Sequence, residues 1–246
     1  MRYSANLNII LKAIEKATAR ISRDFSELEN LQMNPTSAVK FTNAAYAKVK
    51  EILIEDLSNV RPEYNIVFAD GQKVINKADA EYNFVIYPID GINNLVRAIP
   101  DFTIAIALEH INKDGTRESI SVAINKIIGN ELYYCEKGFG AYLNNRKIRT
   151  SKRGSDETPL ICLDDYSYFD QDLKTSIGVK SFSLRSYGCR TLEIAYLASA
   201  KFDLAFFKNW NYEYLNPFML LVREANGKVF EKEKFVLASN NLINLS

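Results

Sequence analysis

One uninterrupted apolar run limits the folds open to this chain. The segment Thr103-Ile104-Ala105-Ile106-Ala107-Leu108 lacks the polar alternation of a strand that faces water on one side. A strand that is apolar on both faces is buried on both, as in sheets that carry helices on each side. We therefore predict a layered α/β (α+β) protein in which a strand at 102–111 lies between helical layers.

Two amphipathic helices are predicted before this strand. From about residue 4 to 31, apolar residues recur every three or four positions, which is the period of a helix with one buried face. These residues are Leu7, Ile10, Ile14, Ala17, Ile21 and Phe25. Asn34-Pro35 ends this helix. A second helix is expected to end before Arg61-Pro62, because the residue that precedes proline avoids the helical region.

Short β-rich runs at 64–69, 83–88, 118–128 and 131–136 predict the neighbouring strands. The last third alternates between a strand near 160–164, a helix near 190–200, a strand at 203–207 and a helix near 214–225 that ends at Asn226-Gly227. No repeat or flexible linker interrupts the chain. We predict one unit over 1–246, with approximate halves 1–150, which holds the larger sheet, and 151–246, a smaller α/β half.

Charge and cysteine content exclude several classes of protein. The 31 basic and 30 acidic residues give a net charge of +1, which argues against a dominant nucleic-acid or membrane surface. A basic cluster at 146–153 is interpreted as a solvated loop. Three widely spaced cysteines suggest neither a disulfide framework nor a zinc site, and the first residues lack the apolar core of a signal peptide. A soluble protein of the reducing cytoplasm is expected.

The most informative motif is Tyr87-Pro88-Ile89-Asp90-Gly91-Ile92-Asn93-Asn94, at the end of a predicted strand. Gly91 and Ile92 are expected to open a helix whose free N–H groups favour phosphate or sulfate. Asp90 supplies the anionic oxygen that a hard cation prefers. Tyr87 does not, because a phenol with a reference pKa of about 10 stays neutral at pH 7.

This motif resembles the Asp-Pro-(Ile/Leu)-Asp-Gly-Thr-(Thr)-Asn signature of the inositol monophosphatase family. Further pieces resemble that family in the same order. They are Phe139-Gly140-Ala141-Tyr142-Leu143-Asn144, Arg185-Ser186-Tyr187-Gly188 and Val222-Arg223-Glu224-Ala225-Asn226-Gly227. The chain is identified as a member of this family over nearly its whole length, and its bacterial SuhB-like branch is the most similar.

The resemblance implies a fold and partners that the residues alone do not specify. The family fold is a layered αβαβα sandwich, and its members are usually homodimers. The SuhB-like branch binds the transcription antitermination machinery, which implies a protein partner of that kind. Contact with a membrane is not expected, and nucleic-acid binding is disfavoured.

The family holds two or three Mg²⁺ ions with carboxylates that are mostly replaced here. The glutamate of the family's Gly-Glu-Glu-Ser turn aligns with Ala69, and Asp70 is its non-ligating neighbour. The first signature aspartate is Tyr87, and the threonine that holds the attacking water is Ile92. The acidic residue that supports this water appears as Tyr46. The resemblance therefore implies a degenerate metal site.

The remaining positions of the family site also lose a carboxylate or gain a positive charge. The Trp-Asp pair falls on Glu213-Tyr214, or on Trp210-Asn211 if a gap is allowed, and both alignments lose the aspartate. The substrate-binding helix start is Gly188-Cys189-Arg190. It places a long cation where the substrate ring would lie. Two orientations are open: Arg190 reaches toward Asp90 and neutralises it, or it points to solvent.

Two interpretations of function follow. The first is a catalytically impaired pseudophosphatase that needs no cofactor and has a binding or regulatory role. The alternative is a Mg²⁺-dependent phosphomonoesterase that acts on inositol monophosphate or a related small sugar phosphate. In the alternative, Asp70, Asp90 and Glu213 form a rearranged metal site.

Overall fold

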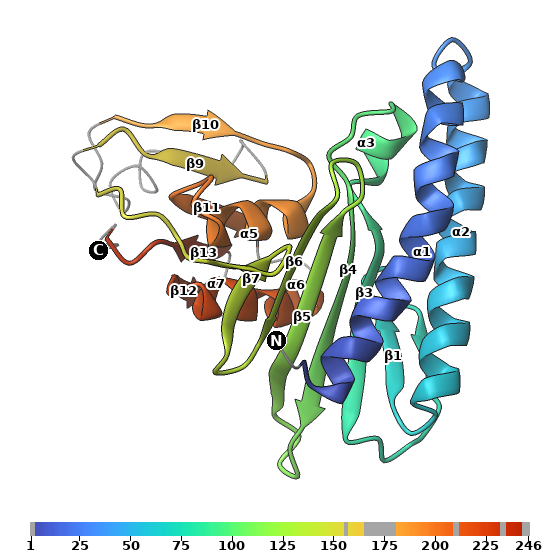
Figure 1. Cartoon of the computed structure of the whole chain (residues 1–246), viewed down its shortest axis with the longest axis horizontal. Helices are drawn as coiled ribbons and strands as arrows, with labels where there is room; N and C mark the ends of the chain where they lie inside the picture. The colour runs from blue at the N-terminus through green and yellow to red at the C-terminus, as the bar shows by residue number, and fades with distance from the viewer. Residues whose placement is uncertain (1–2, 155–156, 165–180, 209–211, 232–234, 243–246) are drawn as a thin grey trace.

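Two long helices, α1 (Ala5–Asn30) and α2 (Pro35–Val60), form an outer layer in the computed structural model (Figure 1). The structure describes residues 3–154, 157–164, 181–208, 212–231 and 235–242. Both predicted helices are confirmed, and all six apolar residues predicted for one face of α1 are buried. α1 ends at Asn30, before the predicted Asn34-Pro35. These two residues begin α2 instead: the side chain of Asn34 accepts a hydrogen bond from the Ser37 N–H, and Pro35 occupies the first turn.

The larger sheet lies beneath these helices and has the order β2-β1-β3-β4-β5-β6-β7-β8. β1 is parallel to β3, and the other neighbours are antiparallel. Its strands are β1 (Asn65–Phe68), β2 (Lys73–Val74), β3 (Tyr82–Asp90), β4 (Thr103–Ile111), β5 (Arg117–Lys126), β6 (Glu131–Glu136), β7 (Gly140–Leu143) and β8 (Arg146–Ile148). The first seven residues of β4 are buried, which confirms the prediction of a strand covered on both faces.

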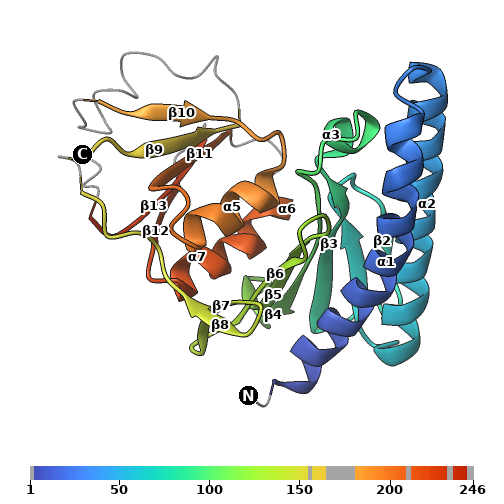
Figure 2. The same ribbon diagram turned by 45° about the horizontal axis from the view of Figure 1, so that its top comes forward.

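A second helical layer separates this sheet from a smaller one (Figure 2). The smaller sheet has the order β10-β9-β11-β13-β12. Its strands are β9 (Leu160–Leu163), β10 (Ser183–Arg185), β11 (Leu204–Lys208), β12 (Lys228–Glu231) and β13 (Phe235–Ser239). The helices between the sheets are α5 (Arg190–Ala198), α6 (Tyr212–Leu215), the 3-10 helix η2 (Asn216–Met219) and α7 (Leu220–Glu224). The predicted layered α/β fold is thus confirmed, with four layers visible in the described residues.

Two large apolar clusters hold the layers together. One joins α1 and α2 to the larger sheet through residues such as Ile14, Leu53 and Ile106. The other joins the opposite face of that sheet to α5 and α7, and it contains Ala105 and Leu221. Burial of this extent is the main favourable term in folding. Within the described part of the chain, no helix has the length and apolar character needed to cross a membrane.

Some elements differ from the sequence prediction. The helix expected at 214–225 consists of α6, η2 and α7, because Pro217 has no N–H to donate and interrupts the regular helical ladder. The segment compared with the family's turn at 139–144 contains β7. Strands β8, β10, β12 and β13 were not predicted, and the first three are half-exposed strands of three or four residues. Asn226 has φ 67°, which confirms the predicted helix end.

Candidate functional site

The signature motif lies where β3 ends and the short helix α3 (Ile92–Val96) begins. The pairing of β3 with β4 shifts register between Tyr87 and Asp90. Gly91 follows with φ 80°, and a Cβ atom there would lie 2.9 Å from the Asp101 carbonyl oxygen. Only glycine fits this position without displacing the backbone. The sequence therefore folds into the sharp strand-to-helix turn that directs the Asp90 carboxylate toward α5.

Asp90 is engaged by protein donors on both oxygens. Its Oδ1 accepts a hydrogen bond from the Gly91 N–H at 3.0 Å. Its Oδ2 accepts from the Thr191 N–H at 2.7 Å and from the Thr191 hydroxyl at 2.8 Å. Thr191 is in the first turn of α5, where N–H groups lack partners within the helix and the dipole favours negative charge. Asp90 thus acts as a cap of α5, supplied from another element.

Two phenols line the same hollow as this carboxylate: Tyr87, at a ligand position of the family, and Tyr46, at the position of the acidic residue that supports the water. Burial raises the pKa of Tyr87, and the negative charge of Asp90 raises it further. Burial likewise raises the pKa of Tyr46, and Asp70 adds to this because it accepts the Tyr46 hydroxyl at 3.1 Å. Both phenols are therefore neutral at physiological pH. Neither supplies the anionic oxygen that Mg²⁺ requires.

Asp70 is paired with Lys50, a residue that the sequence analysis did not single out. The Lys50 ammonium lies 2.6 Å from Asp70 Oδ2 and 4.5 Å from the centre of the Phe68 ring. Burial alone would raise the pKa of Asp70. The hydrogen bonds from Lys50 and from the Gln72 N–H outweigh burial and hold this pKa below its ordinary value. Lys50 is on the same face of α2 as Tyr46, four residues later, and this helical spacing was the available signal.

Arg190 pairs with Asp164, so the expectation that it would neutralise Asp90 is wrong. The Arg190 Nε atom lies 3.2 Å from Asp164 Oδ2, and the Asp164 side chain is 5% exposed. Asp164 follows β9 and was not considered from the sequence. Asp90 Oδ2 instead accepts two hydrogen bonds from Thr191. Arg190 therefore neutralises a carboxylate of the neighbouring sheet.

A fully buried carboxyl group, Glu193, lies close enough to Asp90 and Asp164 for their charges to affect it. Its Oε1 accepts the Tyr187 N–H at 2.8 Å. Burial raises the pKa of Glu193 to about 8, so this group is mostly protonated at pH 7. Cys189 is buried as well, and burial raises the pKa of its thiol far above the ordinary value. Neither group offers an anion to a metal ion.

These residues surround two adjoining hollows that share Ala69, Tyr87 and Asp90. One, of about 460 Å³, is lined by Asn43, Tyr46, Ala69, Asp70, Tyr87, Pro88, Ile89, Asp90, Gly91 and Ile92. The other, of about 400 Å³, is lined by Ala69, Tyr87, Asp90, Asn93, Asp164, Gly188, Arg190 and Glu193. The structure therefore brings the signature motif together with the predicted substrate positions Gly188 and Arg190. We call these two hollows the signature cleft.

Glu213 and Tyr214 do not line the signature cleft. Tyr214 is near enough to contribute to the raised pKa of Tyr87, and a hydrogen bond with Glu213 raises the pKa of Tyr214. Glu213 itself lines a different cavity, away from Asp90. The alternative pair Trp210-Asn211 lies outside the described residues. The structure does not place Glu213 with Asp70 and Asp90 as a rearranged ligand set.

The donor set fits Mg²⁺ poorly. In the described part of the chain, no three His, Cys, Asp or Glu residues are grouped so that they could hold a metal ion. Asp70 is paired with Lys50, Asp164 is paired with Arg190, and Asp90 is bound by the start of α5. A divalent ion would have to compete with these partners for the carboxylate oxygens.

Anion binding at Gly91 and Ile92 stays a prediction. α3 has only five residues, and the Gly91 N–H already donates to Asp90. The carboxylate of Asp90 also places negative charge where an anion would approach. The predicted anion position therefore gains no independent support from this geometry.

Comparison with known proteins agrees with the fold and with the signature motif. The model of the inositol monophosphatase family matches residues 3–244. An inositol-1-monophosphatase of Rhizobium meliloti is 30% identical over 234 residues, which cover 92% of this chain and 85% of the relative. A Nus factor SuhB of Xylella fastidiosa is 27% identical over 232 residues, which cover 91% and 80%.

A solved structure gives the same result. The extragenic suppressor protein SuhB from Bartonella henselae superimposes with a TM-score of 0.80 at 27% identity, and the match covers 99% of this chain and 96% of that one. The fold, the order of the motifs and the length of the match lead to one conclusion. The chain belongs to the inositol monophosphatase family.

Proposed function

We propose that this protein is a pseudophosphatase, a family member that has lost metal-dependent phosphatase activity and has a binding or regulatory role. The observation that carries the proposal is the matching of charges in the signature cleft. Each of the carboxylates Asp70, Asp90 and Asp164 has a protein donor or cation at 3.2 Å or less. Phosphomonoester hydrolysis by this family's chemistry needs metal ions that bind phosphate oxygens and activate a water.

The residues that replace the family's metal ligands support this proposal, because they leave no unbalanced charge among the described residues of the cleft. Where a ligand carboxylate is missing, a neutral phenol or methyl group stands, as at Tyr87 and Ala69. The three aspartates of the cleft, Asp70, Asp90 and Asp164, each have a cation or a helix start to bind. Loss of one ligand alone would leave the other carboxylates unpaired and mutually repulsive, at a cost in stability.

The test is turnover. Purified protein is incubated with inositol 1-phosphate and Mg²⁺, and released phosphate is measured against a metal-dependent family phosphatase as positive control. The expected result is no phosphate release above the rate with EDTA. Mg²⁺-dependent release that is abolished by Asp90→Asn in a variant that still folds would refute the proposal.

The alternative is a working phosphomonoesterase for inositol monophosphate or a related sugar phosphate. It is favoured by the relatives named inositol-1-monophosphatase, of which one is 30% identical to this chain. In that case Mg²⁺ is the cofactor, and it must displace Lys50 from Asp70 and Thr191 from Asp90. The turnover assay decides between the two.

The proposed role extends to partners and location. Relatives named Nus factor SuhB support a protein partner in transcription. Family membership supports a homodimer, and three buried, unpaired cysteines support a reducing, cytoplasmic location. Light scattering after gel filtration tests the dimer: a mass of twice 28.0 kDa supports it, and 28.0 kDa contradicts it.

A further inference from the structure

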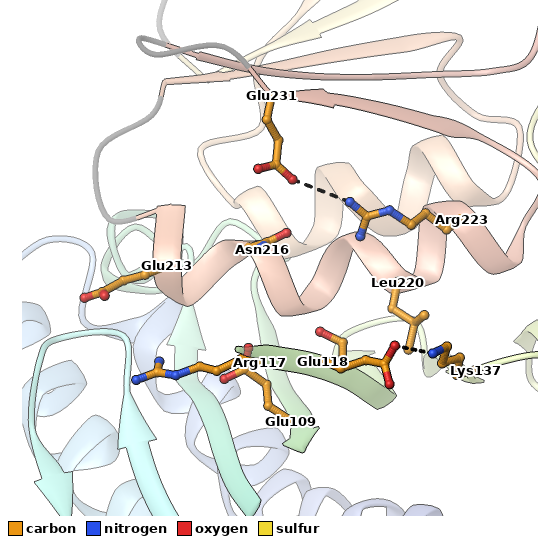
Figure 3. Close-up of a pocket in the computed structure, with 10 residues that line it drawn as sticks. Glu109, Arg117, Glu118, Lys137, Glu213, Asn216, Leu220, Arg223 and Glu231 are labelled. Atoms are coloured by element: carbon orange, nitrogen blue, oxygen red, sulfur yellow. Dashed lines mark hydrogen bonds and ion pairs between the residues drawn. The ribbon is translucent and has the colours of Figure 1, made fainter. Parts of the chain in front are cut away.

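A separate cavity of about 400 Å³ lies at the opposite end of β4 from the signature cleft. Figure 3 shows Glu109 and Arg117 on the sheet side of this cavity and Leu220 and Arg223 on the helix side. β12 contributes Glu231. No residue of the signature motif lines it, and of the positions compared with the family site only Glu213 does. We call it the β4-end cavity.

Glu109 is a buried carboxylate without a complete set of partners. In β4, Ala105 and Ala107 face the helical layer, and Glu109 continues the same face one step further. Its side chain belongs to a residue that is 5% exposed, and its Oε2 atom is buried without a hydrogen-bond partner. An unsatisfied buried carboxylate oxygen is costly and uncommon. An apolar side chain at this position would avoid that cost.

Arg117 is the complementary group. It is the exposed first residue of β5 and pairs with Ile111 of β4. It lies on the same face as Ser119, which pairs with Glu109. Its charge lowers the pKa of Glu109, yet the two side chains form neither an ion pair nor a hydrogen bond. The structure also gives Arg117 no ion pair with another described residue. A carboxylate and a guanidinium thus lie near each other across a gap.

Four of the other charged groups of the cavity are already paired. Lys137 binds Glu118, and Arg223 lies 3.6 Å from Glu231, as the dashed lines in Figure 3 show. These two pairs leave Glu109 and Arg117 without an ion pair among the described residues of the cavity, together with Glu213, which is exposed to solvent. A lone cation in the gap would leave the guanidinium unmatched, and a lone anion would face the buried carboxylate. A metal ion is also disfavoured, since the described residues offer it no group of three ligands.

We propose that the β4-end cavity binds a small zwitterion of the α-amino acid class, with its ammonium group on Glu109 and its carboxylate on Arg117. The ammonium donates to Glu109 Oε2, and the carboxylate accepts from the guanidinium of Arg117 in a charge-assisted contact. A zwitterion adds no net charge to the cavity. It gives Glu109 and Arg117 a partner each and leaves the two existing ion pairs in place.

Binding should depend on pH in a defined direction. Burial raises the pKa of Glu109 to about 7, and a bound ammonium group favours the ionised carboxylate. Affinity is therefore expected to fall as the pH drops below 7. The other titratable or charged groups around Glu109 are Arg117 and Glu118 on β5, Lys137 after β6, Glu213 on α6, Arg223 on α7 and Glu231 on β12.

The test uses calorimetric titration of the full chain with each of the twenty protein L-amino acids in turn. We expect at least one to bind, and its N-acetyl and methyl ester derivatives, which lack one charge each, to bind at least about 10-fold more weakly. Glu109→Gln and Arg117→Met should each cause a similar loss. Glu63→Gln, an exposed carboxylate on another surface, is the control and should bind as the wild type does.

Three results would overturn the proposal. One is the absence of binding by every amino acid at about 10 mM, where even millimolar affinity gives near saturation. Another is undiminished binding by the N-acetyl derivative. The third is unchanged affinity in the substituted proteins. If Glu109→Gln does not fold, Arg117→Met decides, because Arg117 is exposed and its loss leaves the core intact.

Discussion

The two ends of β4 differ in how their charges are matched. At the Thr103 end, beside the signature cleft, the carboxylates of Asp70, Asp90 and Asp164 all have close protein partners. Glu193, which also lines that cleft, has a buried Oε2 without a partner among the described residues, but burial raises its pKa to about 8 and keeps it mostly uncharged at pH 7. At the Glu109 end, a buried carboxylate oxygen lacks a partner, and the nearby Arg117 forms no ion pair. A cleft with internally matched charges stabilises the fold and resists ions. A cavity with unmatched charges gains stability when a ligand supplies the missing partners.

This difference gives Asp90 a structural role of its own. As a cap of α5 it connects the end of β3 in the larger sheet to the helical layer between the sheets. That role needs no metal ion. Asp90 is therefore weak evidence for catalysis, although it belongs to the family's signature motif.

The largest expected effect is at Asp90. Asp90→Ala removes a charged acceptor from two N–H groups and one hydroxyl, so the free energy of unfolding should fall by about 3 kcal/mol. Urea unfolding with and without Mg²⁺ measures this, and the loss should be the same in both. The exposed Asp79→Ala is the matched control, with a change within about 0.5 kcal/mol. A loss seen only with Mg²⁺ would show that Asp90 serves a metal ion.

Glu109→Gln should increase stability at alkaline pH. The pKa of Glu109 is raised from 4.5 to about 7 in the folded protein, so its contribution is fully present below pH 4.5 and is lost as the pH rises through 7. At pH 8 the glutamine variant should be more stable than the wild type by about 2 kcal/mol. This gain should shrink toward zero as the pH falls to 4.5. Urea unfolding at several pH values tests this, and a gain independent of pH would contradict it.

Carboxylates introduced at the family's ligand positions should bind Mg²⁺ more strongly when Lys50 is removed. We predict that Ala69→Glu, Tyr87→Asp and Tyr214→Asp combined with Lys50→Met give a Mg²⁺-dependent rise in melting temperature. The gain in stability should be about 1.4 kcal/mol at ten times the Kd. The same protein with Lys50 retained is the control and should respond less. Equal responses would mean that Lys50 does not compete with metal.

The smallest effect is expected at Arg117. Because it is exposed and forms no ion pair, Arg117→Met should change the free energy of unfolding by within about 0.5 kcal/mol. It should also raise the pKa of Glu109, since Arg117 lowers that pKa in the wild type. Urea unfolding between pH 6 and 8 measures both. A large loss of stability would show that Arg117 has a structural partner.

The layers were predictable from the sequence, because they depend on long-range periodicity. The apolar face of α1 and the doubly buried β4 each extend over enough residues to define their environment. The short strands β8, β10 and β12 were missed because three or four residues at a sheet edge show no clear alternation. The identity of the cleft was equally predictable, because Asp90-Gly91 is a local motif.

The partners of the carboxylates could not be predicted in the same way. Lys50 and Asp70 are 20 residues apart, and Asp164 and Arg190 are 26 apart, so their pairing depends on how separate elements pack. Glu109 looked like an ordinary strand residue, since the sequence does not show that β4 continues beneath η2. The prediction that Arg190 binds Asp90 failed for this reason: Thr191 is the residue that α5 presents to Asp90.

A melting curve in Mg²⁺ decides whether the signature cleft is a metal site. Wild-type protein is heated with EDTA and with increasing MgCl₂, with a metal-dependent family phosphatase as positive control and NaCl at equal ionic strength as reference. We expect the melting temperature of this protein to be the same in EDTA, in MgCl₂ and in NaCl. A rise that saturates with Mg²⁺ and disappears in Asp90→Asn would show that the cleft binds the ion after all.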